Sequence, residues 1–390
     1  MDAVKQLRSA AGGTALTLRP DWFVLTDGTA ESFPRLVGDA ALADSGKVKV
    51  FIDHETPCGS EKSGSRQREL INFAAQRGCE LYNGYGISYQ LMLEKHVRAG
   101  EIVAHCGAFG SIYASAGAAA LSLTAEEMAR ALVTGEVTVT VPEAFTLSVS
   151  GALGRGVSGK DAALDLLPRL APAKGRLLVL DCSAAAWGAA DRAAFCQLLG
   201  LCGCFAAVEG GAQGADLALD LGSVVPMAAG PNDFTNARPA AECGDVAVTS
   251  VFIGGCSQGR IEDIRAAVSV IRGRHVKRGV RALAAFASTE AYVAAANEGL
   301  IAQPPRRRRA GDEPGLLGLL RPQPGARRRQ GHRPQRRQQG LPPTATARAT
   351  CPPICAAPPR PWRAPSPATS ARQRLEEERT MEKCSAAASG

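Results

Sequence analysis

The sequence of 390 residues has few aromatic side chains and no long hydrophobic run. Phe, Trp and Tyr make up 5% of the chain, although 45% of its residues are hydrophobic. No apolar run reaches the roughly 18 residues that a membrane helix needs, so we expect no membrane partner. Residues 1–10 lack the hydrophobic core of a secretory signal, which predicts a cytoplasmic location. In such a protein, twelve cysteines favour reduced thiols or a metal centre over a disulfide framework.

Basic residues are scarce in most of the chain and concentrated at its end. Residues 303–390 carry 18 Lys and Arg against 6 Asp and Glu, together with 15 of the 24 prolines. Residues 1–302 are mildly acidic, with 27 basic and 31 acidic side chains. We therefore expect a globular body in 1–302 and a disordered, basic, Pro-rich tail in 303–390.

The most informative stretch is a strand, a turn and a helix in the second half of the chain. Residues 251–253 predict a short buried strand, and Gly254 and Gly255 allow a tight turn after it. Apolar residues then recur at helical spacing over 261–271. Cys256 lies at the turn, where the amide groups of a helix start favour a thiolate. On spacing alone it is a nucleophile, a metal ligand, a redox thiol or a small buried side chain.

Residues 254–260 read Gly-Gly-Cys-Ser-Gln-Gly-Arg and are followed by Ile-Glu-Asp. This string resembles the segment Gly-Ser-Cys-Thr-Asn-Gly-Arg and Ile-Glu-Asp-Leu of the aconitase and isopropylmalate dehydratase family, with Ser257 and Gln258 in place of Thr-Asn. In that family the cysteine is one of three ligands of a [4Fe–4S] cluster. The resemblance therefore implies that Cys256 is a metal ligand and that Arg260 and Gln258 bind substrate.

A second match follows the strand predicted over residues 48–53. Residues 53–57 read Asp-His-Glu-Thr-Pro, and an amphipathic helix is predicted over 67–77. Both resemble the family's Asp-His-x-Thr-Pro segment and the helix after it, where the Asp-His pair lies in the active site. The resemblance implies that Asp53 and His54 are catalytic, because a carboxylate can fix the tautomer of an imidazole that protonates the leaving hydroxyl. Without matching flanks, such a pair is an ordinary turn.

One aspartate and two histidines of the family pattern are also replaced. The His of Gly-Ile-x-His-Gln is Tyr89 here, and the Asp and His of Asp-Ser-His-Thr are Gly107 and Phe109. Tyrosine titrates far above neutral pH and is a poor proton shuttle. A register slip that brings His105 or Cys106 into the site is disfavoured.

Two further sequence patterns give weaker evidence for a binding or metal site. Ser158 is predicted to cap a helix that follows a glycine-rich segment, and the glycines there lack the spacing of a nucleotide loop. Cys196, Cys202 and Cys204 have the spacing C-x₅-C-x-C, which fits no common zinc pattern. We expect these three to be small buried thiols.

The alternating strands and helices, together with the resemblance over about 48–302, predict an α/β fold. It consists of aconitase-like stacked three-layer α/β domains with mostly parallel sheets. The expected boundaries are 1–150 for domain 1, 151–245 for domain 2 and 246–302 for the start of domain 3, which carries the cluster cysteine. The tail, 303–390, follows.

The family pattern stops at residue 303, before the Cys-x-x-Cys motif that supplies the other two cluster ligands. With GC-rich codons, residues 310–321 permit that motif one nucleotide later, and 354–368 permit a typical family C-terminus in the remaining frame. We therefore hypothesise that residues 303–390 are an out-of-frame translation. The alternative is a genuine basic tail that binds RNA or an acidic partner. Because Trp362 gives no aromatic interleaving for base stacking, we do not expect nucleic acid as a partner.

By resemblance, the chain is the large subunit of an iron–sulfur hydro-lyase that acts on a small hydroxy di- or tricarboxylic acid. One of three cluster cysteines is in place, so impaired or altered chemistry is expected. Because no swivelling domain is present, the expected partner is a small subunit that carries one. A catalytically inactive paralogue that binds such a subunit is the second hypothesis, and the basic-tail binder is the third.

Overall fold

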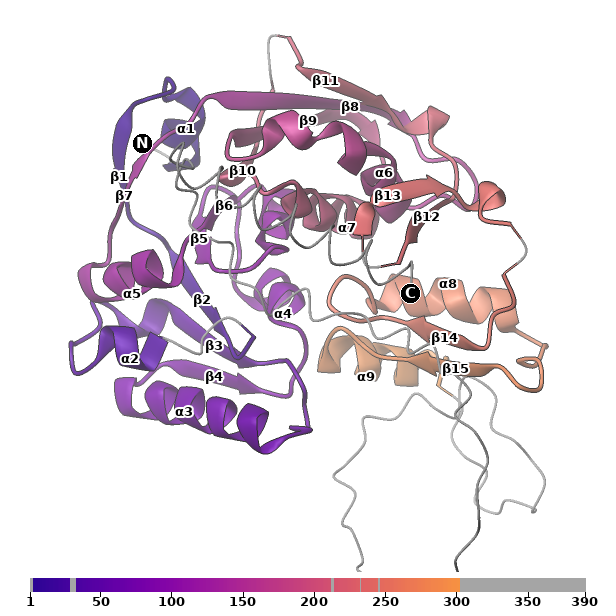
Figure 1. The fold of residues 1–390 in the computed structure, drawn as a ribbon, viewed down its shortest axis with the longest axis horizontal. Coiled ribbons are helices and arrows are strands. Elements are labelled where there is room, and N and C mark those ends of the chain that lie inside the picture. The colour runs from indigo at the N-terminus through magenta and orange to yellow at the C-terminus, as the bar shows by residue number, and fades with distance from the viewer. Residues whose placement is uncertain (1–2, 29–32, 212–213, 232, 245, 302–390) are drawn as a thin grey trace, which may run out of the picture. The chain divides into compact units, whose positions relative to one another are not determined.

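The computed structural model describes residues 3–28, 33–211, 214–231, 233–244 and 246–301. These residues are organised around a nine-stranded sheet in the order β11-β8-β9-β10-β6-β5-β2-β3-β4 (Figure 1). Its strands are β2 (Trp22–Thr26), β3 (Val48–Ile52), β4 (Glu80–Asn83), β5 (Ile102–His105), β6 (Ala119–Ser122), β8 (Ala144–Ala152), β9 (Leu177–Ala186), β10 (Ala206–Glu209) and β11 (Leu217–Asp220).

All neighbours in this sheet are parallel except β6 and β10, which pair antiparallel. The sheet therefore has two parallel halves whose strands run in opposite directions. This largely parallel sheet with surrounding helices confirms the predicted α/β fold class. Strands from both sides of residue 150 share the sheet, and the three domain boundaries stay a prediction.

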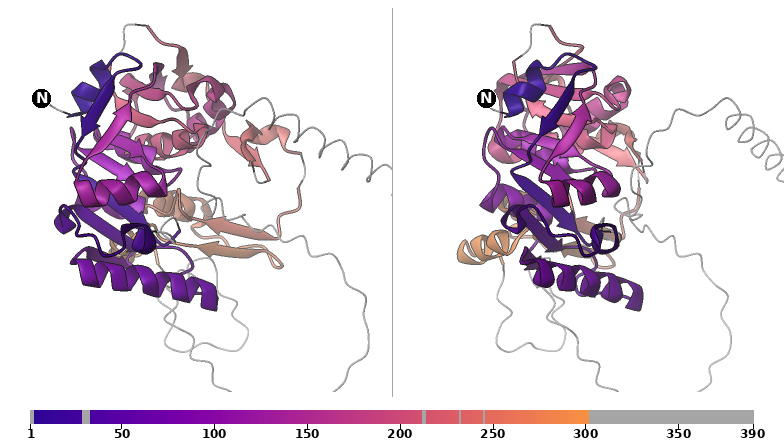
Figure 2. Two further views of the ribbon diagram at one scale, coloured as in Figure 1. Left: turned by 60° about the vertical axis from the view of Figure 1, so that its left-hand side comes forward. Right: turned by 90° about the vertical axis from the view of Figure 1, so that its left-hand side faces the viewer.

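The helices pack on the sheet and on one another (Figures 1 and 2). Helix α3 lies against β3 and β4, α6 packs on α7, and α8 packs on α9. The helices are α1 (Ala3–Ser9), α2 (Phe33–Val37), α3 (Glu61–Arg77), α4 (Ser88–Lys95), α5 (Ala125–Thr134), α6 (Gly159–Leu166), α7 (Ala189–Leu199), α8 (Ile261–Ile271) and α9 (Thr289–Asn297).

Helix α3 begins earlier than the sequence predicts. The hydroxyl of Ser60 accepts a hydrogen bond from the backbone N–H of Ser63 at 3.1 Å and forms a capping box, so the helix starts six residues before Gln67. It ends at Gly78, whose φ of 67° is left-handed. Ser158 is the N-cap residue of α6, as predicted, and its backbone N–H and hydroxyl both donate to the Asp161 carboxylate, at 2.8 and 2.7 Å.

Strand β3 leads to the candidate site and lies between β2 and β4 in the sheet. All five of its residues are buried, as expected for a parallel strand covered on both faces. Val50 and Ile52 join a hydrophobic cluster on one face of the sheet, and Phe51 joins a cluster on the other face. This alternation fixes the register, because a slip of one residue would exchange the two faces.

Three small sheets complete the described fold. Strands β1 (Ala15–Leu18) and β7 (Val137–Thr140) pair antiparallel, as do β12 (Met227–Gly230) and β13 (Asp233–Pro239). Strands β14 (Ser250–Ile253) and β15 (Arg281–Ala284) pair in parallel. Residues 251–253 lie in a strand, as predicted, but the predicted burial is wrong, because Val251 and Phe252 are 37% and 59% exposed. Within the described residues, β14 has β15 as its one partner strand, so its side chains lack a second covering layer.

The other sequence predictions for this part of the chain have mixed outcomes. Cys196 is buried, as predicted, whereas Cys202 and Cys204 are partly buried. No helix among the described residues is long and apolar enough to cross a membrane. The predicted disordered tail and the out-of-frame hypothesis concern residues 303–390, which lie outside the described residues.

Candidate active site

The candidate site lies where two neighbouring parallel strands end. Asp27 directly follows β2, and Asp53 and His54 directly follow β3. Because β2 and β3 pair in parallel, their carboxyl ends meet at the same edge of the sheet. Gln67, from the first half of α3, reaches the same group. The sheet topology therefore brings Asp27 beside Asp53 and His54, which follow it by 26 and 27 residues in the sequence.

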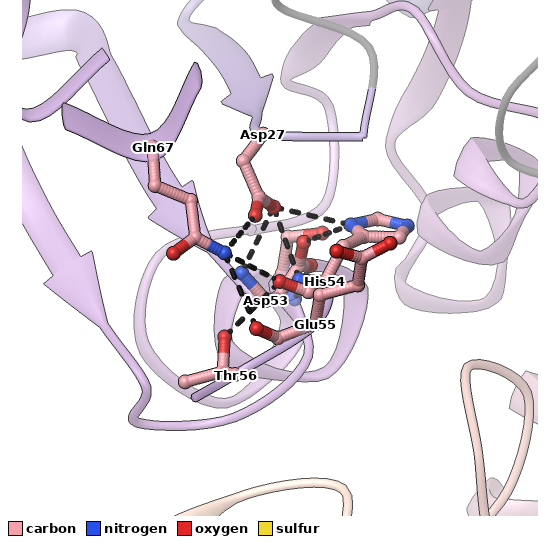
Figure 3. A network of polar contacts seen from close by, with 7 residues as sticks. Asp27, Asp53, His54, Glu55, Thr56 and Gln67 are labelled. Carbon is pink, nitrogen blue, oxygen red and sulfur yellow. Dashed lines mark hydrogen bonds and ion pairs between the residues drawn. The ribbon is translucent and has the colours of Figure 1, made fainter. Parts of the chain in front are cut away.

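Asp27 is fully buried and lies at the centre of a hydrogen-bond network (Figure 3). Its Oδ1 accepts the backbone N–H groups of Asp53 and His54 at 3.1 and 3.0 Å. Its Oδ2 accepts the amide of Gln67 at 3.0 Å. Asp53 accepts the backbone N–H of Ser88 through Oδ2 at 2.8 Å. These contacts fix both carboxylates before any ligand binds.

The imidazole of His54 is held between these two carboxylates. Its Nδ1 lies 2.7 Å from Asp53 Oδ1 and 3.2 Å from Asp27 Oδ1. Because both neighbours are acceptors, Nδ1 carries a proton, and Nε2 remains as the nitrogen that faces away from them (Figure 3). A Cβ on Gly28 would lie 2.5 Å from the ring, so glycine is needed there to make room for the imidazole.

The charges in this network favour a protonated imidazole. Burial alone lowers the pKa of His54, but hydrogen bonds to Asp27 and Asp53 and their negative charges outweigh it and raise the pKa to about 10. Burial alone would raise the pKa of Asp27, but hydrogen bonds from His54, from the Asp53 backbone and from Gln67 lower it. At neutral pH, His54 is therefore an imidazolium whose Nε2–H can be donated.

Asp27, Asp53 and His54 also form a group with three possible metal-ligand atoms within 4.8 Å of one another. Each of the four carboxylate oxygens already accepts a hydrogen bond or faces His54 Nδ1. A cation would have to displace the proton on Nδ1 and most of these bonds. The donor set therefore suits a proton better than a metal ion.

Cys256 lies at the turn between β14 and α8, as predicted, and is exposed. Its carbonyl oxygen accepts the amide of Gln197 at 2.8 Å. A [4Fe–4S] cubane needs three cysteine ligands, and no group of three possible metal ligands in the described part of the chain includes Cys256. The described residues therefore do not fit the cluster that the resemblance implies.

Arg260 is buried and bonded to neighbouring protein groups. Its Nε donates to Gln90 Oε1 at 2.7 Å, its Nη2 to Gln197 Oε1 at 2.9 Å and its Nη1 to the Ser257 carbonyl at 3.3 Å. Burial lowers the pKa of this guanidinium. These contacts with described residues use three of its five N–H donors. Its assignment to substrate binding stays a prediction.

Gln258 faces a neighbouring carboxylate. With its amide nitrogen toward Asp263, it donates to both carboxylate oxygens at 2.7 Å. Asp263 also accepts the backbone N–H groups of Gly259 and Arg260 at 2.8 and 2.9 Å, which caps the start of α8. Gln258 thus stabilises the turn that carries Cys256, and its predicted contact with substrate remains untested.

The first turn of α4 connects the two predicted parts of the site. The backbone N–H of Ser88 binds Asp53, and two residues later the side chain of Gln90 binds Arg260. The segment just before this turn bonds to the chain between β15 and α9, with Ile87 N–H donating to the Ala287 carbonyl at 2.7 Å. The Asp53–His54 pair and Arg260 therefore adjoin one helical turn, although about 200 residues separate them in sequence.

The sequence did not identify Asp27 or Gln67 as site residues. Residues 22–28 predict a strand and a turn, and a single Asp after a strand has no distinctive spacing. The signal that could have found Asp27 is topological, because β2 and β3 are parallel neighbours. Gln67 was predicted only as the start of a helix.

The raised pKa of His54 predicts a pH-dependent stability. A group whose pKa is higher in the folded state stabilises the fold fully below its unfolded pKa of 6.5, and this contribution is lost as pH rises toward about 10. Between pH 6.5 and about 8.5 we expect the free energy of unfolding of the wild type to fall by about 2 kcal/mol. In Asp27→Asn the fall should be much smaller. Urea unfolding at several pH values measures both.

The wild type and Asp27→Asn share the other titrating groups of the fold, so the difference between their slopes in this window reports on His54. Burial lowers the pKa of His105 to about 4, so its contribution changes below pH 6.5. Burial raises the pKa of Cys79 and Cys182 to about 11 from 9.0, so these thiols act above the window. Equal slopes in the wild type and in Asp27→Asn would contradict the network described above.

Comparisons with known proteins identify related sequences. A family model described as the aconitase family (aconitate hydratase) matches residues 217–303. The chain is 27% identical over 331 residues to the 3-isopropylmalate dehydratase large subunit 2 of Archaeoglobus fulgidus, a match that covers 76% of this chain and 79% of that protein. It is 26% identical over 332 residues to the homoaconitase large subunit of Thermus thermophilus, covering 75% and 77% of the two chains.

A solved structure has a similar fold. The crystal structure of Thermococcus kodakaraensis aconitase X in its holo-form superposes with a TM-score of 0.51. The superposition covers 73% of this chain and 75% of that chain, with 9% sequence identity. At this level of identity the likeness concerns the fold alone.

Proposed function

We propose that this chain, a divergent member of the family that contains aconitases and 3-isopropylmalate dehydratase large subunits, carries a hydro-lyase site. The substrate class is a hydroxy di- or tricarboxylic acid. The observation that carries the proposal is the imidazole of His54, held between Asp27 and Asp53 and protonated at neutral pH. A dehydration needs such an acid, because hydroxide is a poor leaving group.

Each step of the dehydration is assigned to a different group. A base removes the proton from the carbon next to the hydroxyl-bearing carbon, and the electron pair of that C–H bond forms the new C=C bond. The C–O bond breaks as His54 Nε2 gives its proton to the departing oxygen, so that water leaves. Asp53 and Asp27 orient the ring and stabilise its charge. We expect the base on a small partner subunit.

Two cationic side chains can donate hydrogen bonds to an anionic substrate, while the carboxylates of Asp27 and Asp53 offset the charge of the imidazolium. His54 is cationic at neutral pH, and contacts with described residues use three of the five N–H donors of Arg260. The [4Fe–4S] cluster expected from the resemblance enters no step here, because the described residues offer it one cysteine, Cys256.

A turnover assay tests the proposal. The full chain, mixed with a 3-isopropylmalate dehydratase small subunit, is incubated with 3-isopropylmalate, citrate or homocitrate. We expect water elimination from at least one acid, detected by the absorbance of the new double bond. The small subunit alone is the control. If no acid reacts and none binds to the chain by calorimetry, the proposal is wrong.

A second candidate function is a catalytically inactive paralogue that binds a small subunit. The described residues favour it, because no group of three possible metal ligands among them includes Cys256, and a single thiolate does not hold a cubane. Iron and sulfide analysis after anaerobic reconstitution, combined with the assay above, separates the two. A stable complex with the small subunit, without turnover, supports the paralogue.

The gene sequence across codon 303 decides the out-of-frame hypothesis separately. We expect codons that restore a Cys-x-x-Cys motif in another frame, and codons that exclude it would refute the hypothesis. A frame-corrected chain should then hold more iron and sulfide after reconstitution than the present chain does.

A further inference from the structure

A short loop with two cysteines connects α7 to β10. After α7 the chain makes a 3₁₀ turn over Gly200–Cys202, and it passes through Gly203 and Cys204 before β10 begins at Ala206. Gly203 has a φ of 73° and a ψ of 34°, a left-handed conformation that favours glycine. The backbone therefore changes from a right-handed turn to a left-handed residue between the two cysteines.

This backbone conformation brings the two thiols together. The Cys204 thiol forms a hydrogen bond with the Cys202 sulfur, and the backbone N–H groups of both cysteines also bond to that sulfur. Successive amides in a right-handed and a left-handed residue form a concave arrangement that favours an anion. The loop is therefore built to hold a thiolate on Cys202 with a second thiol beside it.

The contacts make the two thiols chemically different. The hydrogen bond from Cys204 lowers the pKa of Cys202 below its ordinary value, and the backbone N–H groups add to this effect against the opposing effect of burial. The same hydrogen bond, together with burial and the charge of Cys202, raises the pKa of Cys204. Because the thiolate is the reactive form, Cys202 is the nucleophile of the pair.

The loop is accessible, and its backbone is fixed by bonds that involve no sulfur. Both thiols are partly buried, and Gly203 between them is exposed. The Gly203 carbonyl accepts the N–H of Gly175 at 2.9 Å, and Phe205 N–H donates to the Arg176 carbonyl at 2.9 Å. A bond between the two sulfurs breaks neither of these contacts. The loop can therefore hold the pair in place in both the reduced and the oxidised form.

We infer that Cys202 and Cys204 are a thiol–disulfide exchange site, which a small disulfide such as oxidised glutathione converts reversibly to an intramolecular disulfide. This inference is independent of the proposed hydro-lyase function. The Cys202 thiolate attacks one sulfur of the small disulfide, whose S–S bond breaks and releases one thiolate. Cys204 then gives its proton to that thiolate and attacks the Cys202 sulfur, which releases the second thiolate. The protein loses two electrons, and the small disulfide becomes two thiols.

Cys243 is the internal control for this pair. It is also partly buried, and its thiol donates to the Pro239 carbonyl at 3.8 Å. No other cysteine lies within five residues of it in the sequence. With oxidised glutathione, Cys243 should therefore form at most a mixed disulfide.

The test places the full chain in anaerobic glutathione buffers with different ratios of the reduced and oxidised forms. Acid quenching, alkylation of the remaining thiols and mass spectrometry of tryptic peptides then report the state of each cysteine. We expect Cys202 and Cys204 to lose alkylation together, in a peptide lighter by two hydrogens. The oxidised fraction should follow the square of the reduced glutathione concentration, because closing the disulfide releases two thiols. A mixed disulfide on Cys243 would follow its first power.

Two variants separate the roles of the thiols. Cys204→Ser should trap glutathione on Cys202, because no second thiol is left to displace it. Without the hydrogen bond from Cys204, the alkylation of Cys202 at pH 7 should also become about fivefold slower. Cys202→Ser should leave Cys204 reduced in buffers that fully oxidise the wild type.

The wild type alone is sufficient to overturn the inference, so a variant that does not fold leaves the test intact. A pair that stays reduced in every buffer contradicts it. A wild type that keeps glutathione on Cys202 while Cys204 remains open to alkylation contradicts it as well. Neither result bears on dehydration, which the turnover assay measures separately.

Discussion

Replacing His54 by glutamine is expected to slow dehydration by about 10²- to 10⁴-fold. Glutamine can still donate a hydrogen bond toward Asp27 and Asp53, so the network that holds the position is partly kept. It cannot carry the proton that the departing hydroxyl needs. The loss should therefore fall on kcat, with a small change in KM, in assays of the preferred acid at pH 7.

His96→Gln is the matched control for this variant. His96 lies at the end of α4, and its Nε2 is 2.8 Å from the Tyr82 hydroxyl, so it belongs to a different cluster. We expect the turnover rate of His96→Gln to remain within about twofold of the wild-type rate. Equal kcat values for His54→Gln and the wild type would exclude His54 as the proton donor.

Arg260→Lys is expected to lower the free energy of unfolding by about 2–4 kcal/mol. Lysine keeps the positive charge but lacks the planar fork that reaches Gln90, Gln197 and the Ser257 carbonyl together. The two glutamine oxygens would lose a buried partner, and Gln197 is 1% exposed. Urea unfolding measures this loss, and hydrogen exchange should show faster opening of residues 250–271.

Arg265→Lys provides the comparison on the same helix. Arg265 is half exposed and pairs with Glu298 at the protein surface, where solvent screens an ion pair and leaves it a small effect on stability. We expect the free energy of unfolding of Arg265→Lys to stay close to that of the wild type. If Arg260→Lys is as stable as Arg265→Lys but binds acid more weakly, Arg260 acts on substrate rather than on the fold.

The sequence predicts the local elements well and the contacts between them poorly. The strand before Asp53, the helix from Ile261 and the cap at Ser158 follow from hydrophobic periodicity and local hydrogen bonding, and the structure has all three. These signals are local, so no knowledge of the fold is needed to find them.

The errors and omissions have a different physical origin. Periodicity indicates that Val251 and Phe252 form a strand, but it does not say which layers cover that strand. Asp27 was missed because its role depends on which strands are neighbours. Tyr89 and Gly107 were recognised as two separate losses, because only tertiary structure brings a tyrosine hydroxyl beside a glycine 18 residues later.

The strand direction reverses between β6 and β10, so the two halves of the sheet position site residues in different ways. One half of the sheet delivers its ionisable groups from strand ends. The other half runs the opposite way, so at that same edge it offers a helix end, where α7 contributes the uncharged amide of Gln197. A change of pH should therefore act on the reaction through the strand-end groups of the first half. Substitutions in the second half should change the position of Arg260 and leave the pH dependence of the reaction unchanged.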